Sequence, residues 1–249
     1  MFDYSDCPIR DERVGPFKLH INASQLSSNG LLKPNAYLEL SCHAADLYHE
    51  SMGLSLQDMI GAGQAWIITA ANFSIKKHVS VEHHEISAVT WLEGTRGPYA
   101  QRKIEFSLDG EVYFTTTFYC VFFDLKSRTF FRKVPAGVYG KNTNSKEASP
   151  PRMRVPEKLT AVLKRTVMPS DIDCIGHANN TRYGAYAFDA LTADEIANFK
   201  NVREFEIQFR RELPLGETFE ISRTKEDDKI YIVGSSGGNS NFESFFRFG

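Results

Sequence analysis

The sequence contains few cysteines and no long apolar segment. The four cysteines lie far apart in the 249 residues and form no Cys-x-x-Cys pair; they are Cys7, Cys42, Cys120 and Cys174. This spacing predicts reduced thiols, as in cytoplasmic proteins. No segment approaches the roughly 20 apolar residues of a membrane-spanning helix, and the first residues lack the basic and apolar stretches of a signal peptide. We therefore expect a cytoplasmic protein without a membrane span.

An excess of basic charge is also lacking, as are several short catalytic motifs. Lys and Arg number 29 against 31 Asp and Glu, which gives a formal net charge of -2 and argues against nucleic acid as the main partner. No Gly-x-Ser-x-Gly segment is present, so a serine nucleophile of that type is unsupported. His83-His84-Glu85 suggests a metal, but it has neither the His-Glu-x-x-His spacing nor a third ligand. We expect no metal ion and no other cofactor.

The most informative segment is a short polar loop that precedes an amphipathic helix. The loop holds an acid, a glycine turn, a histidine and two amides: Asp173, Gly176, His177, Asn179 and Asn180. The spacing of one buried helical face follows at once, formed by Tyr183, Tyr186, Ala187, Ala190 and Leu191. The loop therefore lies at a helix N-terminus, where free N–H groups favour negative charge. An acid and a base beside such an anion site are typical of acyl-transfer or hydrolytic chemistry.

A weaker copy of this loop and helix occurs near the start of the chain. In both copies a tyrosine follows a glycine after seven residues, as Gly30 and Tyr37 and as Gly176 and Tyr183. A helical stripe follows here too, formed by Tyr37, Leu40, Ser41, Ala44, Ala45 and Tyr48. The polar groups are not repeated: the positions of Asp173, His177, Asn179 and Asn180 are taken by Ser27, Leu31, Lys33 and Pro34. This asymmetry predicts one chemical site per chain, in the C-terminal copy.

Strand-like segments follow each helix. In the first half they are Ala65–Ile75, Glu85–Leu92, Ala100–Leu108 and Glu111–Phe123, and in the second half Arg203–Leu213, Thr218–Lys225, Lys229–Gly234 and Phe242–Phe248. Asp109-Gly110 is a strong hairpin signal. Residues 136–157 are rich in Gly, Pro, Asn and Ser without periodicity, which is typical of a linker. We expect an α+β protein with an N-terminal domain at 1–135, a linker at 136–157 and a C-terminal domain at 158–249.

The loop that runs Asp173-Cys-Ile-Gly-His-Ala-Asn-Asn-Thr-Arg-Tyr183 resembles that of the hotdog-fold acyl thioesterases. The duplication is similar to the acyl-ACP thioesterase family of plants and bacteria. The resemblance extends over roughly residues 15–135 and 158–235 through Trp66-Ile-Ile-Thr69, Thr90-Trp91, Asp109-Gly110-Glu111 and Phe209-Arg-Arg-Glu-Leu213. It implies a tandem (double) hotdog fold, in which each unit is a long helix wrapped by an antiparallel β-sheet.

The resemblance also implies an activity and a set of site residues. The chain would hydrolyse fatty acyl-ACP to free fatty acid by attack of water on the thioester, with acyl carrier protein as its partner. Asp173, His177 and Glu212 would be catalytic, with His177 or Glu212 as the base. Substrate and oxyanion contacts would come from Gly176, Asn179 and Asn180. The acyl chain would lie in the N-terminal unit. One departure stands out, because Ile175 takes the place of the family's usual Asn.

Several alternatives remain open. The same scaffold could serve an acyl-CoA thioesterase, a non-catalytic acyl-binding protein or a hydratase, and the chain could form a homodimer. Strand alternation would place Glu212 on one solvated face with Glu206, Gln208 and Arg210, which explains Glu212 without catalysis. Asn179 and Asn180 could be ordinary helix-start residues, and Cys174 a packed thiol. Docking of an acidic carrier protein would need basic groups, for which the candidates are Lys76-Lys77, Arg152, Arg154, Lys164-Arg165 and Arg210-Arg211.

Overall fold

The computed structural model describes residues 12–134 and 142–249, which fall into two compact units. Unit 1 comprises the described residues up to His20, Leu40–Ala71 and those between Glu85 and Pro151; unit 2 comprises Ile21–Glu39, Asn72–His84 and Arg152–Gly249. The division is not sequential, because helix α1 (Pro34–Glu50) and strand β2 (Gln64–Ile75) each contribute residues to both units. The domain boundaries expected at residues 135 and 158 stay a prediction.

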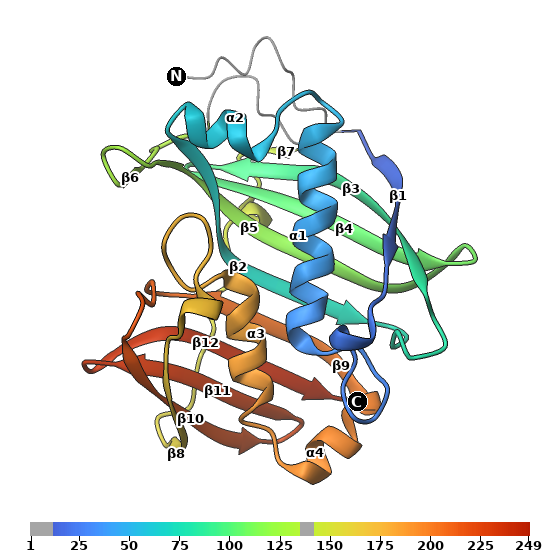
Figure 1. The fold of residues 1–249 in the computed structure, drawn as a ribbon, viewed down its shortest axis with the longest axis vertical. Coiled ribbons are helices and arrows are strands. Elements are labelled where there is room, and N and C mark those ends of the chain that lie inside the picture. Colours follow the sequence, from blue (N-terminus) through green and yellow to red (C-terminus); the bar gives the residue numbers. More distant parts are fainter. Residues whose placement is uncertain (1–11, 135–141) are drawn as a thin grey trace. The chain divides into compact units, whose positions relative to one another are not determined.

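Unit 1 is an antiparallel sheet in the order β1-β3-β4-β5-β2. The strands are β1 (Val14–His20), β2, β3 (Glu85–Arg96), β4 (Tyr99–Leu108) and β5 (Glu111–Asp124), with short β6 (Thr129–Phe130) and β7 (Asn142–Thr143). Figure 1 shows α1 crossing one face of the sheet. Short helices α2 (Leu56–Gly61) and η2 (Lys146–Ala148) complete the unit. The Asp109-Gly110 turn is confirmed, with φ of 49° and 80°, both in the left-handed region that this hairpin needs.

The predicted stripe of the first helix faces the core of unit 1. Leu40, Ala44 and Tyr48 of α1 are at most 3% exposed. The facing strands contribute inward side chains at every second position, as the pleat of a sheet requires; among them are Phe106, Phe114, Phe118 and Phe122. Burial of one such side chain contributes about 1.5–3 kcal/mol. The helical periodicity of the sequence therefore predicted the buried face of this helix.

A polar cluster is buried within this core. The guanidinium of Arg102 on β4 donates to His49 Nε2 at 3.2 Å and to Thr90 Oγ1 at 3.3 Å, and it lies 4.2 Å from the ring centre of Tyr48. Burial and the positive charge of Arg102 lower the pKa of His49 to about 3. His49 is therefore neutral at pH 7 and accepts a hydrogen bond from the arginine.

Unit 2 is a second antiparallel sheet, in the order β9-β12-β11-β10-β8. The strands are β8 (Thr160–Thr166), β9 (Val202–Phe209), β10 (Thr218–Glu226), β11 (Lys229–Ser236) and β12 (Asn239–Phe248), and the helices are η1 (Ala23–Gln25), η3 (Pro169–Asp171), α3 (Asn180–Phe188), α4 (Ala193–Ala197) and η4 (Phe199–Asn201). Helix α3 lies across the sheet (Figure 1). The ring of Tyr183 on α3 makes edge contacts with Phe209 and Phe242, which anchors the helix.

Two elements of unit 2 end earlier than the sequence predicts. Helix α3 stops at Phe188, and Ala190 and Leu191 are buried outside any helix, because Thr192 caps a new helix, α4. Strand β9 stops at Phe209, because the amides of Arg210 and Arg211 both donate to Asn241 O and the ladder ends there. The solvated face expected from the alternation of residues in β9 is also wrong, since Glu206 and Gln208 are 6% and 3% exposed.

No helix within residues 12–134 and 142–249 is both long enough and apolar enough to cross a membrane.

Candidate active site

The polar loop in unit 2 is a tight hairpin closed by backbone hydrogen bonds. The amide of Asp173 donates to His177 O at 3.0 Å, and the amide of Asn179 donates to Asp171 O at 2.8 Å. Gly176 adopts a φ of 94° at the tip, a conformation that is strained for any residue with a Cβ. The glycine therefore makes the turn, and the stem of the loop leads directly into α3.

One hydrogen bond attaches this loop to the segment after β9. The amide of Ala178 donates to Leu213 O at 3.0 Å. The neighbours of these two residues then meet, and His177 Nε2 lies 3.0 Å from Glu212 Oε2. The side chains of His177 and Glu212 are 22% and 53% exposed, so water can reach both. The structure thus brings together two of the three residues predicted to be catalytic, although Glu212 lies on a loop and not on the predicted strand.

Asp173, the third predicted catalytic residue, supports the turn. Its Oδ1 accepts a hydrogen bond from the amide of Ile175 at 2.9 Å, and its carbonyl accepts one from the amide of Gly176 at 3.0 Å. The first contact is that of an Asx turn, and the second closes a β-turn. No hydrogen bond joins the Asp173 carboxylate to the His177 ring within the described chain. The amide of Gly176 is likewise occupied, so it is not free to hold an oxyanion.

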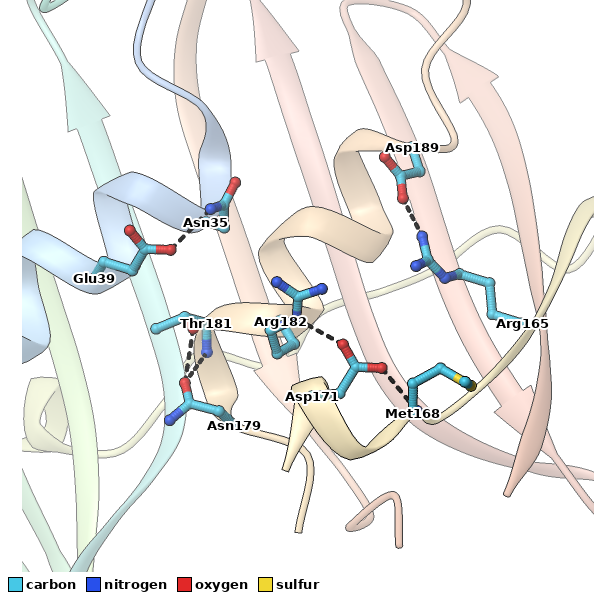
Figure 2. A network of polar contacts seen from close by, with 9 residues as sticks. All are labelled: Asn35, Glu39, Arg165, Met168, Asp171, Asn179, Thr181, Arg182 and Asp189. Carbon is cyan, nitrogen blue, oxygen red and sulfur yellow. Dashed lines mark hydrogen bonds and ion pairs between the residues drawn. The ribbon is translucent and has the colours of Figure 1, made fainter. Parts of the chain in front are cut away.

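The two asparagines mark the start of α3. Asn179 Oδ1 accepts hydrogen bonds from Thr181 N at 2.9 Å and Thr181 Oγ1 at 2.7 Å, which makes Asn179 the N-cap (Figure 2). Asn180, the first residue of α3, makes no side-chain hydrogen bond to the described residues. Among the described residues the amides of His177 and Asn180 also lack a backbone acceptor. These two N–H groups, with the Asn180 side chain, are the free donors beside the histidine.

Sequence reasoning missed an ion pair at the stem of the loop. Asp171 is 3% exposed, its Oδ1 accepts from Arg182 Nε at 2.8 Å, and its Oδ2 accepts from the amide of Met168 at 3.0 Å (Figure 2). Burial alone would raise the pKa of Asp171, but these hydrogen bonds and the arginine charge lower it below its usual value. The available signal was an acid that begins the loop and an arginine in the first turn of the helix.

The predicted copy of the loop has the same backbone. Ser27 N donates to Leu31 O, Gly30 N to Ser27 O, Leu32 N to Val79 O and Lys33 N to Gln25 O. Each of these hydrogen bonds has a counterpart in the loop described above. The loop residues of the two copies correspond at a constant offset along the chain. The copy has no counterpart of the His177–Glu212 pair, because Leu31 stands at the histidine position. His78, at the position of Glu212, lies near Tyr37 Oη and Val202 O instead.

The structure also shows the surroundings of the residues that the sequence suggested for carrier-protein docking and metal binding. Arg165, Arg210 and Arg211 are each paired with a carboxylate, of Asp189, Glu243 and Glu217 respectively, so three of the proposed basic docking groups are neutralised. Within residues 12–134 and 142–249 no three His, Cys, Asp or Glu side chains come together as metal ligands. His83, which the sequence suggested as a metal ligand, instead accepts a hydrogen bond at Nδ1 from the amide of Ser80 in a local turn.

One family model matches part of this chain, and the fold of the chain is similar to that of solved structures. Residues 157–241 match the family model described as the acyl-ACP thioesterase C-terminal domain. The fold is similar to that of an acyl-ACP thioesterase from Bacteroides thetaiotaomicron, with a TM-score of 0.76, 17% identity and coverage of 94% of this chain and 97% of that one. It is also similar to a 12:0-ACP thioesterase from Umbellularia californica, with a TM-score of 0.77, 14% identity and coverage of 96% of both chains.

A search of curated protein sequences gives no match. At these identities the structural likeness shows the fold, and the predicted tandem hotdog architecture is confirmed. The predicted family resemblance is confirmed as well, through the C-terminal model.

Proposed function

Because residues 157–241 match the acyl-ACP thioesterase C-terminal domain, we propose that this chain hydrolyses fatty acyl-ACP to free fatty acid and carrier protein. The observation that carries the proposal is the contact of 3.0 Å between His177 and Glu212 beside the N-terminus of α3. A water-accessible imidazole held by a carboxylate is a suitable general base.

The chemistry follows from the tautomer that this contact favours. A neutral imidazole that donates from Nε2 to Glu212 keeps its lone pair on Nδ1, and Nδ1 makes no hydrogen bond to the described residues. We propose that Nδ1 takes a proton from water as the water oxygen attacks the thioester carbonyl. Glu212 stabilises the imidazolium that forms. The tetrahedral intermediate then collapses with cleavage of the C–S bond, and the same proton passes from the imidazolium to the leaving thiolate, so that water and thioester become acid and thiol.

The oxyanion of the tetrahedral intermediate needs donors that are not already used. The amides of His177 and Asn180 meet this condition among the described residues, and the N-terminal end of the α3 dipole adds to them. In this proposal Gly176 shapes the turn, Asn179 caps the helix, and Asn180 is the asparagine that contacts substrate. Asp173 keeps the loop in the conformation that exposes these donors.

The direct test is hydrolysis by purified protein. Wild-type protein should release thiol from acyl-ACP, and His177→Ala should lower kcat at least tenfold, because general base catalysis contributes roughly 10²–10⁴. Asp173→Asn should also lower kcat at least tenfold, since it weakens the acceptor of the Ile175 amide. Unchanged turnover in both variants would refute the site assignment.

A second candidate function is acyl binding without catalysis, and Ile175 favours it. This side chain is 37% exposed at the tip of the loop, and it offers no hydrogen bond where the family resemblance implies an amide. Tight binding of a fatty acyl thioester with no thiol release above background would support this function. An acyl-CoA thioesterase is distinguished by kinetics with CoA and carrier-protein thioesters side by side.

We propose a cytoplasmic location, acyl carrier protein as the natural carrier, and the N-terminal unit as the acyl-chain site. Homodimer formation also stays a prediction. Light scattering of the purified chain, with and without carrier protein, measures both associations.

A further inference from the structure

The ion pair between Asp171 and Arg182 occurs in only one of the two loop copies. The counterpart of Asp171 is Gln25, whose Oε1 accepts the amide of Asn22 at 3.0 Å, just as Asp171 Oδ2 accepts the amide of Met168 at 3.0 Å. The counterpart of Arg182 is Ala36. The backbone hydrogen bonds within the two hairpins nevertheless correspond one to one. The hairpin therefore forms without an acid or an arginine at these positions.

The ion pair must then have another purpose. A buried carboxylate has a desolvation cost that a glutamine largely avoids, and the copy without chemistry uses the glutamine. The costly arrangement is found in the copy that holds His177 and Glu212. Its contacts join the segment before the loop, at Met168, to the first turn of α3 after the loop, at Arg182 (Figure 2).

We propose, building on the function proposed above, that Asp171 and Arg182 are positioning residues for His177. The ion pair fixes α3 and the loop stem against each other, and the Ala178 amide then presents His177 to Glu212 at 3.0 Å. Among the described residues, neither Asp171 nor Arg182 forms a hydrogen bond or ion pair with His177 or Glu212. Their effect is on geometry, and displacements of about 1 Å can cost a hundredfold in rate.

The copy itself supplies the test variants. Asp171→Gln, alone and combined with Arg182→Ala, recreates the side chains of Gln25 and Ala36. We expect a melting temperature close to that of wild type, a fall in kcat of at least tenfold, and a change in KM of less than about twofold. Arg182→Lys, which keeps a cation beside Asp171, should recover most of the kcat lost in Arg182→Ala.

The other end of α3 offers a matched control. Asp189 pairs with Arg165 at the C-cap of the same helix (Figure 2), so Asp189→Asn also removes one aspartate charge and one ion pair. We expect its kcat to stay within about twofold of wild type. Equal losses of kcat in Asp171→Gln and Asp189→Asn would overturn the proposal, because a general loss of helix stability would then explain both.

A measurement without substrate separates this proposal from the proposed function. In nuclear magnetic resonance spectra, the His177 ring nitrogens of Asp171→Gln should shift toward their positions in Glu212→Gln, while Asp189→Asn should match wild type. If His177 signals are the same in Asp171→Gln and wild type, positioning by Asp171 is refuted even where thioester hydrolysis is observed. If the signals shift but wild-type protein hydrolyses no thioester, the positioning stands and the proposed function fails.

Discussion

Ile175 shows at the scale of one residue how backbone and side chain can have separate roles. Its amide is tied to Asp173 Oδ1 at 2.9 Å, and its side chain is 37% exposed. The backbone contact accepts any residue with a free N–H, so the loop tolerates an apolar side chain at its tip. What is lost is an amide that could orient a water or a thioester oxygen.

This separation makes Ile175→Asn a direct test. The variant keeps the backbone contact and adds an amide group, which can both donate and accept hydrogen bonds, at the tip of the loop that carries His177, so we expect kcat on acyl-ACP to rise about threefold or more. Steady-state kinetics measure the effect. Ile175→Ala is the control, because it removes apolar surface without adding an amide, and it should not raise kcat. A lower kcat in Ile175→Asn than in Ile175→Ala would show that the site does not use an amide here.

At the scale of elements, local patterns in the sequence predicted where helices and hairpins begin. The Tyr37 and Tyr183 stripes, the two glycine turns and the Asp109-Gly110 hairpin depend on residues close in the chain, and all appear in the structure. The predicted ends of α3 and β9 were wrong, because the true ends depend on distant or competing partners. Asn241 O accepts hydrogen bonds from the two amides after Phe209, and Thr192 caps a new helix.

Some contacts of the candidate site could be predicted from the sequence, and others could not. The contact of His177 with Glu212 was accessible through resemblance, whereas the partner of Asp171 was not. Pairing of Asp171 with Arg182 depends on how α3 leaves the loop, and the sequence alone shows only that both charges are present. Occupied amides, such as that of Gly176, are likewise invisible until the backbone hydrogen bonds are known.

Gly184 tests how closely elements pack in unit 2. A Cβ at Gly184 of α3 would lie 2.8 Å from Leu38 Cδ1 and 2.9 Å from Asn35 N, at the start of α1. Backbone cannot move aside as a flexible side chain does, so Gly184→Ala should destabilise the protein by about 1–3 kcal/mol, measured by urea unfolding. Gly61 in α2 is the control, since a Cβ there would meet nothing within 4 Å. Gly61→Ala should be neutral or stabilising; equal effects in both variants would contradict the close contact.

At the scale of the whole molecule, the buried cluster of unit 1 predicts how stability depends on pH. His49 has a pKa of about 3 in the folded protein, against about 6.5 in an unfolded chain. Between these values the unfolded state binds one more proton at this position, so the free energy of unfolding rises with pH and its slope approaches about 1.4 kcal/mol per pH unit. The contribution is complete above about pH 6.5 and is lost as the pH falls toward 3.

Urea unfolding at pH 7, 6 and 5 measures this contribution when wild type is compared with His49→Gln. Glutamine can still accept the hydrogen bond from Arg102 through its side-chain oxygen but does not titrate, so other groups contribute equally to both proteins and cancel in the difference. We expect the variant to lose less stability than wild type between pH 7 and pH 5. Parallel curves would mean that His49 can be protonated beside Arg102 without cost. The cluster would then have to open toward water, because a buried site closed to water cannot hold two adjacent cations.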